Sequence, residues 1–298
     1  MNRKRIIFGH LLALFSNFVW ASVFVSTKIL LNVMSPIDIL LYRFIVGYLF
    51  LFLLRPKLFK TGSFKMELNF ILCGLTGIAL NCVLESEALL YTGSAIVSVI
   101  VAASPFMVGL LAKFVLGQKL NRFFTVGFIL AISGISMICL IGNNDNKLNY
   151  IGELISIGAS LAWAIYGLFS ENINKMNFDA ILVTRRMFFY GTLFVFPVYL
   201  IKGDFESLRY LSQPLYLGNI VFLGMVACAL AFYAWNKSID LIGTVTANLY
   251  VYLLPVITIF MSALILNEKI TIWMIIGTIL TLSGVALSNY RGEKNERK

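Results

Sequence analysis

Two acidic residues, Glu85 and Glu87, lie inside a long apolar segment of this chain, in the run Leu84-Glu-Ser-Glu-Ala88. An ionisable group in such a segment is costly unless it is paired or hydrated, so it is a functional candidate by default. On a helix, residues two positions apart point about 200° away from each other, so both carboxylates cannot face one site. Asn81 lies one turn before Glu85 on the same face. We therefore favour Glu85, with Asn81 beside it, as the pair that faces a binding site.

These acidic residues have two interpretations. A partly desolvated carboxylate can exchange a proton near neutral pH, which a proton-coupling group needs. The alternative is an ion pair from either residue to Arg43 or Lys28 that only holds helices together. The sequence leaves both open for Glu85, and for Glu87 it favours the ion pair.

Two arginines, Arg43 and Arg186, stand inside apolar segments at matching places in the two halves of the chain. Because the same residue occurs at both positions, we favour a structural or gate-forming role over direct substrate contact. Lys28 lies at the far end of its apolar segment, where a long side chain reaches the interface. We expect Arg185 to reach the interface in the same way.

Uncharged polar and aromatic residues supply the remaining candidates for a binding site. Amides and ring faces suit small amphipathic molecules, because rings pack against apolar parts while a few polar groups orient the rest. For any single ring, helix packing is the competing interpretation. The candidates are Asn17, Trp20, Trp163, Tyr166, Asn248 and Tyr250.

Two prolines, Pro105 and Pro255, fall within apolar segments, again at matching places in the two halves. Each removes a backbone hydrogen bond and kinks its helix. The sequence does not decide whether the kinks are hinges or fixed bends.

Several kinds of chemistry are excluded or disfavoured. His10 is the only histidine, and the four cysteines lack metal-ligand spacing, so we expect no metal site and no cofactor. No phosphate-binding loop of the Gly-x4-Gly-Lys-[Ser/Thr] type occurs, so this chain does not hydrolyse ATP in that way. The shortage of candidate catalytic groups at a membrane surface predicts a protein that is not an enzyme.

The elements that must position these residues follow from composition. Hydrophobic residues make up 59% and charged residues only 13% of the 298, with a mean hydropathy of +0.88. About 25% charged residues is usual for a soluble domain, so much of this surface faces lipid. Apolar stretches of about 20 residues predict an all-α integral membrane protein with ten transmembrane helices. They lie at 9–31, 36–54, 67–91, 93–116, 123–142, 150–171, 179–201, 214–236, 243–266 and 271–289.

Lysine and arginine residues in the connections predict the orientation. If the N-terminus is cytoplasmic, only Lys147, Lys202, Arg209 and Lys269 fall outside, whereas the other connecting basic residues fall inside. An excess of basic residues marks the cytoplasmic side. Both termini are therefore predicted to be cytoplasmic, in the cell membrane. The formal charge of +10 comes largely from basic residues next to the apolar segments, a pattern that indicates membrane orientation. We therefore expect no nucleic-acid partner.

The chain repeats itself. At one constant offset, Gly9, Trp20, Ala21 and Arg43 match Gly152, Trp163, Ala164 and Arg186. At a second, slightly longer offset, Gly74, Pro105, Leu116 and Gly134 match Gly224, Pro255, Leu266 and Gly284. We infer two units, 1–143 and 144–298, of five helices each. An odd number of spans inverts the second unit, an architecture common in secondary transporters.

Small residues recur within the fifth and tenth predicted spans. Gly127 and Gly134 share one helix face, and so do Gly277 and Gly284. Small residues on one face permit close approach of a neighbouring helix. These glycines therefore predict close helix packing within the chain or a dimer contact.

The matched residues carry a family resemblance. Gly9-x10-Trp-Ala, the embedded arginines and Gly93-x11-Pro-x10-Leu-x2-Lys119 resemble the drug/metabolite transporter superfamily, in particular its EamA-type ten-helix branch. The run Leu266-Asn-Glu-Lys-Ile270 resembles a signature of that family, from which the first unit departs with Gln118. The resemblance covers nearly the whole chain and implies a transporter of small metabolites.

The sequence therefore predicts a secondary active transporter that works by alternating access. Its partners are the lipid bilayer, a small-molecule substrate and protons as coupling ion, and it is a monomer or a dimer. By resemblance, the substrates are amino acids or related compounds, with export favoured. Efflux of cationic or aromatic toxic compounds is the alternative. A membrane-embedded enzyme acting on a lipid-linked substrate belongs to another class, and the short loops argue against it.

Overall fold

The structure is a computed structural model that describes residues 3–57, 59, 61–116, 122–142, 150–174, 176, 178–242, 246–247 and 249–289. Within these ranges every regular element is a helix. Eight helices are long and apolar enough to cross a membrane, and Tyr250–Ile265 and Ile272–Leu287 are shorter apolar helices. The chain is therefore an all-α, multi-pass membrane protein. The count of ten spans stays a prediction, because the last two helices are shorter than the roughly 20 residues that a bilayer requires.

The first half of the chain contains seven α-helices and two π-helical segments among the described residues. They are α1 (Arg3–Leu30), α2 (Pro36–Leu54), α3 (Phe64–Cys73), η1 (Gly74–Leu80), α4 (Asn81–Tyr91), α5 (Ser94–Ala102), α6 (Ser104–Leu116), α7 (Arg122–Met137) and η2 (Ile138–Gly142). The run α3–η1–α4 is one continuous helical span.

The second half has a similar series. It consists of α8 (Ile151–Asn174), α9 (Ala180–Lys202), the 3-10 segment η3 (Phe205–Ser212), α10 (Pro214–Val221), η4 (Phe222–Ala231), α11 (Phe232–Ile242), η5 (Leu249–Tyr252), α13 (Leu253–Ile265) and α14 (Ile272–Asn289). Here α10–η4–α11 forms one continuous helical run.

Local sequence fixes where α2 begins. The Ser35 hydroxyl accepts a hydrogen bond from the Asp38 backbone N–H at 3.3 Å, and the Asp38 carboxylate accepts one from the Ser35 N–H at 3.1 Å. Pro36 follows at the first helical position, where its missing N–H costs nothing. The other Asp38 oxygen accepts from the Asp204 N–H at 3.0 Å. The start of α2 is thereby joined to the connection that precedes η3.

The π-helical segments η1 and η4 interrupt two long helices at equivalent places, since they begin at or near the matched residues Gly74 and Gly224. Such segments are rare and are frequently found at functional sites. A β-carbon on Gly74 would lie 2.9 Å from the Gly191 nitrogen, and one on Gly224 would lie 2.8 Å from the Arg43 carbonyl oxygen. Both segments therefore pack directly against a neighbouring backbone.

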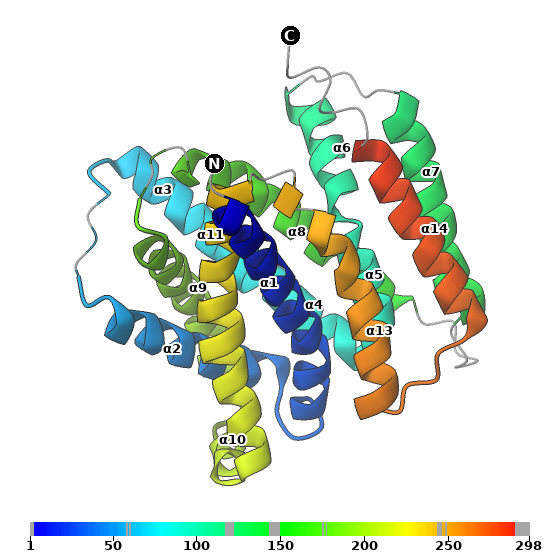
Figure 1. The fold of residues 1–298 in the computed structure, drawn as a ribbon. Coiled ribbons are helices and arrows are strands. Elements are labelled where there is room, and N and C mark those ends of the chain that lie inside the picture. The colour runs from blue at the N-terminus through cyan, green and yellow to red at the C-terminus, as the bar shows by residue number, and fades with distance from the viewer. Residues whose placement is uncertain are drawn as a thin grey trace.

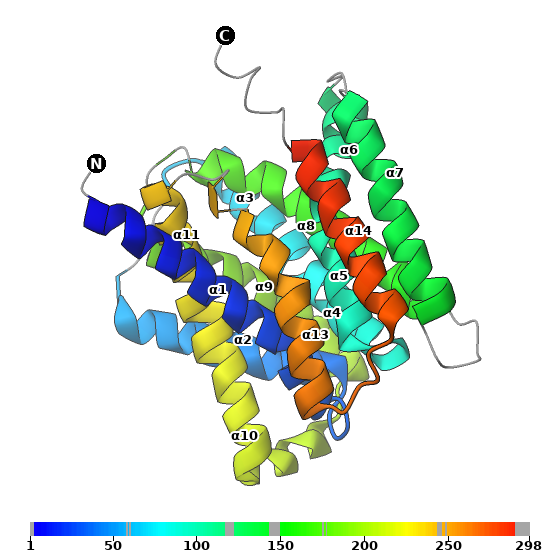
Figure 2. The same ribbon diagram turned by 45° about the vertical axis from the view of Figure 1, so that its right-hand side comes forward.

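Figure 1 shows the helices as a single bundle in which α1 begins and α14 ends at the same end. We call this the terminal end and the other the opposite end. Helices α7 and α14 lie side by side along one flank in both views (Figures 1 and 2). A β-carbon on Gly134 would lie 2.4 Å from the Gly277 carbonyl oxygen, and one on Gly284 would lie 2.4 Å from that of Gly127. These glycines thus pack within the chain.

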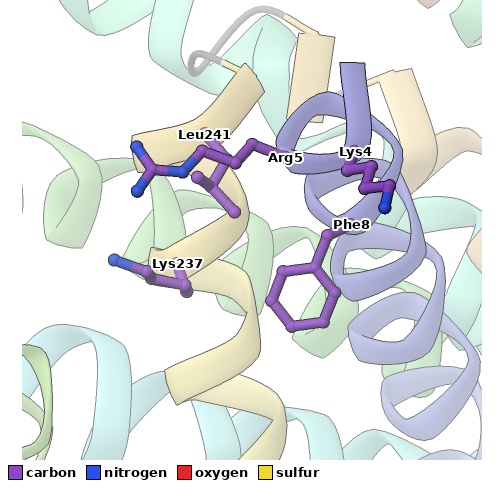
Figure 3. Close-up of a pocket in the computed structure, with 5 residues that line it drawn as sticks. All are labelled: Lys4, Arg5, Phe8, Lys237 and Leu241. Atoms are coloured by element: carbon purple, nitrogen blue, oxygen red, sulfur yellow. The ribbon is translucent and has the colours of Figure 1, made fainter. Parts of the chain in front are cut away.

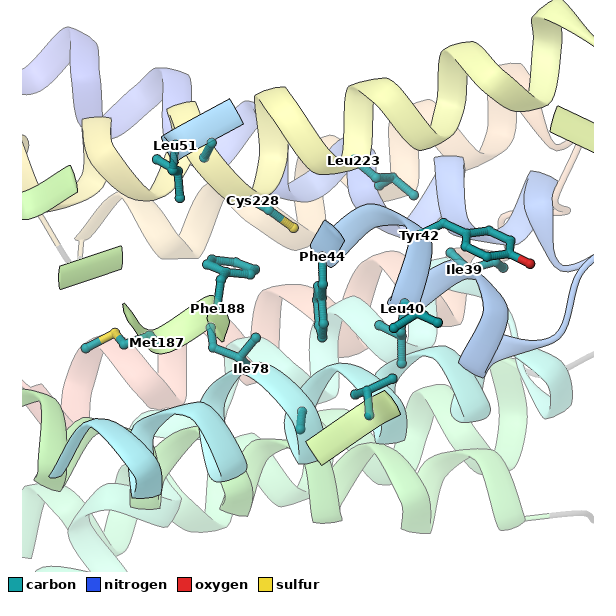
Figure 4. Close-up of a cluster of buried hydrophobic side chains, with 14 of the residues drawn as sticks. Ile39, Leu40, Tyr42, Phe44, Leu51, Ile78, Met187, Phe188, Leu223 and Cys228 are labelled. Atoms are coloured by element: carbon teal, nitrogen blue, oxygen red, sulfur yellow. The ribbon is translucent and has the colours of Figure 1, made fainter. Parts of the chain in front are cut away.

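The largest buried cluster of side chains lies where α2, η1, α9 and η4 meet (Figure 4). The rings of Phe44 and Phe188 cross edge-to-face with centroids 5.5 Å apart. Cys228 is buried in the same cluster and, like the other three cysteines, forms no disulfide. Outside the core, many large apolar side chains such as Leu53 and Leu154 are exposed. That surface suits lipid rather than water.

Candidate functional site

The site is assembled around α4, the helix that follows the π-helical segment η1. Asn81 opens α4 and is 3% exposed. Its side-chain N–H group donates to the Glu85 carboxylate at 3.3 Å and to the Ala159 carbonyl of α8 at 3.2 Å. The predicted pairing of Asn81 with Glu85 on one face is therefore present, and the pair is held against α8.

Arg43 comes from α2 and is 4% exposed. Its guanidinium lies within electrostatic reach of Glu85 and of Cys82 and Cys228. Arg43 and Glu85 nevertheless form no ion pair at contact distance. The Nε atom of Arg43 is buried and has no hydrogen-bond partner. A buried guanidinium and a partly buried carboxyl group thus face one region without direct contact.

An aromatic group adjoins these polar residues. The Trp20 ring of α1 lies 6.5 Å from the Trp163 ring of α8, measured between centroids, and Trp163 lies 4.9 Å from Tyr166. Trp20 also contacts Phe232 at 5.2 Å and Trp235 at 5.3 Å, both on α11. Three of the predicted aromatic candidates, Trp20, Trp163 and Tyr166, therefore lie together. Trp163 is one turn along α8 from Ala159, whose carbonyl accepts a hydrogen bond from Asn81.

Several buried polar atoms in this region lack partners. The Asn17 side chain is fully buried and donates to the Ala13 carbonyl at 2.9 Å, but its oxygen has no donor. The indole N–H of Trp20, one turn further along α1, has no acceptor. Buried polar groups are nearly always hydrogen-bonded, so each exception requires an explanation. Together with the Nε of Arg43, the region therefore has one acceptor, the Asn17 oxygen, and two donors, on Trp20 and Arg43, without hydrogen-bond partners.

We refer to the polar and aromatic residues described above as the central cluster. Its members are Asn17, Trp20, Arg43, Asn81, Glu85, Trp163 and Tyr166.

Glu87 is not part of the central cluster. It is half-buried, and no hydrogen bond or ion pair joins it to another described residue. The ion pair that the sequence favoured for Glu87 is absent from the described part of the chain.

Arg186 occupies a different environment from Arg43. Its guanidinium makes an ion pair with Glu67 of α3 at 2.7 Å and a second hydrogen bond to the same oxygen at 2.8 Å. The Tyr190 hydroxyl donates to that oxygen, and the Thr61 hydroxyl donates to the other at 2.7 Å. Of the ion-pair candidates, Arg186 is the one placed in an ion pair among the described residues.

Arg185 differs from the prediction that it reaches the interface. It is buried, and its guanidinium donates to the Arg55 carbonyl at 2.6 Å and to the Lys57 carbonyl. The connection after α2 offers backbone acceptors that satisfy the charge inside the protein. Arg185 therefore fixes this connection instead of extending to the surface.

A second polar group lies at the opposite end, around the turn at 91–94 between α4 and α5. Lys28 of α1 donates to the carbonyls of Leu89 and of Thr92, the latter at 2.9 Å, which places a cation at the C-terminus of α4. The Thr92 hydroxyl donates to Glu153 of α8 at 3.2 Å. Lys28 is thus held by backbone acceptors and is not at a free interface.

Glu268 completes this group from the segment after α13. One of its oxygens accepts from the Ser94 N–H at 3.0 Å and from the Ser94 hydroxyl at 2.8 Å. A carboxylate at the N-terminus of α5 satisfies an unpaired N–H and interacts favourably with the helix dipole. Residues from α1, α8 and the segment after α13 therefore hold the 91–94 turn. The glutamate of the Leu266–Ile270 run acts here as a helix cap.

The remaining candidates lie apart from the central cluster. The Tyr250 hydroxyl lies 2.9 Å from Nδ1 of His10, which joins η5 to α1 nearer the terminal end. Asn248 lies outside the described residues. Pro105 is the second residue of α6, directly after a break at Ala103, and Pro255 is the third residue of α13, after η5. Pro105 thus lies within the span Ser94–Leu111 and Pro255 within the helix Tyr250–Ile265, each just after a local change of helical geometry.

Sequence reasoning did not select Trp235, Phe232 or Glu67. A signal existed for Trp235, because it is the counterpart of Glu85 in the second half of the chain. Glu67 stands near the start of its helix, where an acidic residue looks like a solvated cap. Among the described residues, no group of three or more His, Cys, Asp or Glu could hold a metal ion.

Comparison with known proteins gives a consistent result. The EamA-like transporter family matches this chain twice, over residues 7–140 and 150–290. An uncharacterized transporter of Archaeoglobus fulgidus is 25% identical over 285 residues, covering 94% of this chain and 96% of its own. A probable amino-acid metabolite efflux pump of Salmonella typhimurium is 23% identical over 289 residues, covering 93% of each. A solved crystal structure of a protein shares the fold, with a TM-score of 0.66, 15% identity, and coverage of 94% of this chain and 96% of that one.

Proposed function

We propose, from the premise that this chain belongs to the EamA-like transporter family, that it exports amino acids or related metabolites across the cytoplasmic membrane as a proton-coupled secondary transporter. That it is a membrane transporter of small molecules follows from the family and its relatives. The substrate class, the direction and the coupling ion are the proposal. The relative from Salmonella typhimurium, named a probable amino-acid metabolite efflux pump, supports the first two.

The observation that carries the proposal is the set of unsatisfied polar atoms in the central cluster. An amino acid offers a carboxylate, an ammonium group and a side chain. The Arg43 guanidinium suits the carboxylate, the Glu85 carboxylate suits the ammonium group, and the Trp20–Trp163 pair suits an apolar or aromatic side chain. A ligand bound there would also satisfy the open donors of Arg43 and Trp20. Export of cationic aromatic compounds would use Glu85 and the rings but not Arg43.

Inverted repeats support alternating access in this proposal. Trp20 and Trp163 occupy matched positions in the two halves and their rings are in contact, as expected for equivalent residues beside a pseudo-two-fold axis between two units. We therefore assign units 1–143 and 144–298, with a substrate site where they meet. The distribution of basic residues supports a cytoplasmic terminal end.

The residues around the 91–94 turn are proposed to close the opposite end. Replacing Ser94 by Ala or Glu268 by Gln removes or weakens the cap on α5 and should favour opening there. Cys82 lies beside the central cluster and can report this through labelling by a membrane-impermeant thiol reagent, with Cys82→Ser as the background. Faster labelling of Cys82 from that side supports the assignment, and unchanged labelling in both variants contradicts it.

The proposed transport is tested with purified protein in proteoliposomes. Counterflow and uptake of labelled amino acids and cationic dyes are measured with and without a pH gradient. We expect saturable, gradient-driven flux of amino acids. Glu85→Gln should retain exchange but lose its dependence on the gradient. Glu87→Gln is the matched control, because it removes the same charge two residues away. Flux of dyes alone would favour the alternative, and equal effects of the two substitutions would remove Glu85 from the coupling role.

A further inference from the structure

A second carboxyl group, that of Glu153 on α8, is buried at the opposite end of the bundle. Glu153 is 5% exposed and lies within the apolar span Ile151–Ser170. One of its oxygens accepts the hydrogen bond from the Thr92 hydroxyl, and the other, Oε2, is buried without a partner. In the part of the chain that the structure describes, no cation lies within ion-pair distance of Glu153. This carboxyl group is therefore held in place but not neutralised by a neighbour.

The titratable groups near Glu153 do not compensate it. Lys28 of α1 reaches the same turn, but its ammonium group donates to two backbone carbonyls there and is attracted by Glu268. The Cys139 thiol of η2 is within electrostatic reach of Glu153 and carries no positive charge. Helix α5 carries no titratable side chain. A buried carboxylate without a cation is costly, and the uptake of one proton removes that cost.

Helix α4 connects Glu153 to the central cluster. On α4, Asn81, Glu85 and Thr92 follow each other at i, i+4 and i+11, so they share one face. Helix α8 runs along that face, because its Ala159 carbonyl accepts from Asn81 at 3.2 Å and its Glu153 carboxylate accepts from Thr92 at 3.2 Å. About 10 Å along α4 separates Glu85 from Thr92. Glu85 and Glu153 thus belong to one helix–helix interface.

The face of α8 that carries Glu153 leads to the same cluster. Ser156, Ser160 and Trp163 follow Glu153 at i+3, i+7 and i+10, so all four share this face. Both serine side chains are buried, and the Ser160 hydroxyl donates to the Ser156 carbonyl at 3.1 Å. The face therefore runs from a carboxyl group at the opposite end, past two hydroxyl groups, to a ring of the central cluster.

Helix α1 has the matching face in the first half of the chain. His10 and Trp20 are the counterparts of Glu153 and Trp163 at one constant offset. Next to His10, α1 packs against α11, because a β-carbon on Gly9 would lie 2.9 Å from Leu241. The cavity of about 440 Å³ between these two helices is lined by Lys4, Arg5, Phe8, Lys237 and Leu241 (Figure 3). The two units thus place one titratable side chain at an equivalent position near each end of the bundle.

We propose that Glu153 is a second proton-binding group of the transport cycle, which takes up a proton from water when the opposite end opens and passes it towards Glu85. The inference rests on the proposed function, because it assumes that transport is coupled to protons. In export driven by an inward proton gradient, protons enter from the opposite side, which is where Glu153 lies. Glu85 then has a partner on that side through which it exchanges protons with water.

A proton fits this carboxyl group better than a metal cation does. Hard cations such as Ca²⁺ and Mg²⁺ take about six or more oxygen ligands. At the 91–94 turn, two backbone carbonyls already accept from Lys28, and the Ser94 hydroxyl already donates to Glu268. The open oxygens there are Oε2 of Glu153 and Oε2 of Glu268. One oxygen is enough for a proton.

The experiment varies the pH on one side of the membrane at a time. Proteoliposomes of one orientation are selected through an affinity tag at the C-terminus. Initial rates of gradient-driven amino-acid flux are measured while the pH on the opposite side is changed from about 5 to about 8. Glu153→Gln keeps an acceptor for the Thr92 hydroxyl but takes up no proton, whereas Thr92→Val removes that hydrogen bond but keeps the carboxyl group. Glu206→Gln is the matched control, because it removes an exposed carboxylate from the same end.

We expect the wild-type rate to change at least about fivefold over this pH range, and the rate of Glu153→Gln to change less than about twofold. Exchange of substrate without a gradient should stay within about twofold of wild type in Glu153→Gln, because exchange requires no proton uptake from the opposite side. Thr92→Val and Glu206→Gln should keep the wild-type pH dependence, because both retain the Glu153 carboxyl group.

A wild-type pH dependence in Glu153→Gln would overturn the inference, and so would an equal loss in Thr92→Val, which would assign the effect to the hydrogen bond. Rates that follow Na⁺ and not pH on the opposite side would overturn the proton in favour of a metal cation. If gradient-driven flux is lost in Glu85→Gln but kept in Glu153→Gln, the proposed function stands and this inference falls. Wild-type flux that is indifferent to pH on both sides would remove the proposed coupling to protons, and this inference with it.

Discussion

Arg43 and Arg186 occupy matched positions in the two halves of the chain, but the protein surrounds them in opposite ways. Arg186 is bonded twice to one oxygen of Glu67, and Tyr190 and Thr61 complete the carboxylate's partners. Arg43 is more deeply buried and has an open Nε; its guanidinium interacts with the Cys82 thiol and the Phe44 ring, and it attracts Glu85 without forming an ion pair at contact distance. The counterpart of Glu67 in the second half is Leu217, so the first arginine has no equivalent of the acidic partner.

The difference shows what a matched residue does and does not imply. A buried charge that lacks a partner is destabilising, and a protein retains such a group where it serves function. The charge at the same place in the second half is already compensated by the Glu67 carboxylate. Arg43 and Arg186 thus occupy equivalent positions but have different roles. The two roles predict different results when each arginine is substituted.

Substrate affinity should separate the two arginines most strongly. Arg43→Gln removes the cation proposed to bind the substrate carboxylate, and we expect an affinity loss of at least about thirtyfold, because truncating one partner of a buried charge pair costs about 2–5 kcal/mol. Arg186→Gln should change affinity by less than about twofold in protein that remains folded. Initial rates over a substrate concentration series in proteoliposomes measure both. If both substitutions raised the half-saturating concentration alike, the functional distinction would be wrong.

Stability should show the reverse order. Arg186→Gln and Glu67→Gln should each lower the free energy of unfolding by about 1–2 kcal/mol, less than for a fully buried pair, because the Arg186 side chain is 31% exposed. Their double variant should lose less than the sum of the two. Arg43→Gln should leave stability unchanged or raise it, because it removes a poorly paired buried charge. Thermal unfolding followed by tryptophan fluorescence measures all four. A marked loss for Arg43→Gln would mean that its charge is already satisfied.

Packing beside the central cluster gives a smaller and more local test. A β-carbon on Gly77 would lie 2.3 Å from the Tyr166 ring, whereas one on Gly167 would meet nothing within 4 Å. Gly77→Ala should therefore displace Tyr166 and destabilise by about 1–3 kcal/mol. Gly167→Ala on the same helix as Tyr166 should stabilise by about 0.5–1 kcal/mol, because alanine favours a helix. Unfolding temperatures of opposite shift would support the contact, and equal shifts would contradict it.

Much of the fold could be predicted from the sequence, because the length of an apolar segment indicates whether it can span a membrane. The eight long helices lie at predicted positions, and the pairing of Asn81 with Glu85 followed from helix periodicity. The π-helical segments were not predictable, because they depend on how η1 and η4 pack against neighbouring backbone. Pro105 and Pro255 were expected within their spans, and each lies there just after a local change of helical geometry, at Ala103 and at the end of η5.

Partners of charged residues were the least predictable part of the site. Helix rotation decides which of Arg43, Glu67 and Glu85 meet, and rotation is set by packing across the whole bundle. The sequence therefore left open how Lys28, Arg43, Glu85 and Glu87 pair with one another. The structure gives Lys28 two backbone carbonyls and Glu87 no partner among the described residues. Only three-dimensional contacts could distinguish them.

The smallest expected effect concerns a single open donor, the indole N–H of Trp20. Trp20→Phe keeps an aromatic ring against Trp163 but removes the indole N–H that has no acceptor in the structure. If the substrate supplies that acceptor, the loss of one hydrogen bond of about 1 kcal/mol lowers substrate affinity roughly fivefold. Trp273→Phe, on the exposed surface of α14, is the matched control and should leave affinity unchanged. Unchanged affinity in Trp20→Phe would mean that water or no ligand satisfies this N–H. Of the two open donors in the central cluster, only the Nε of Arg43 would then be assigned to the substrate.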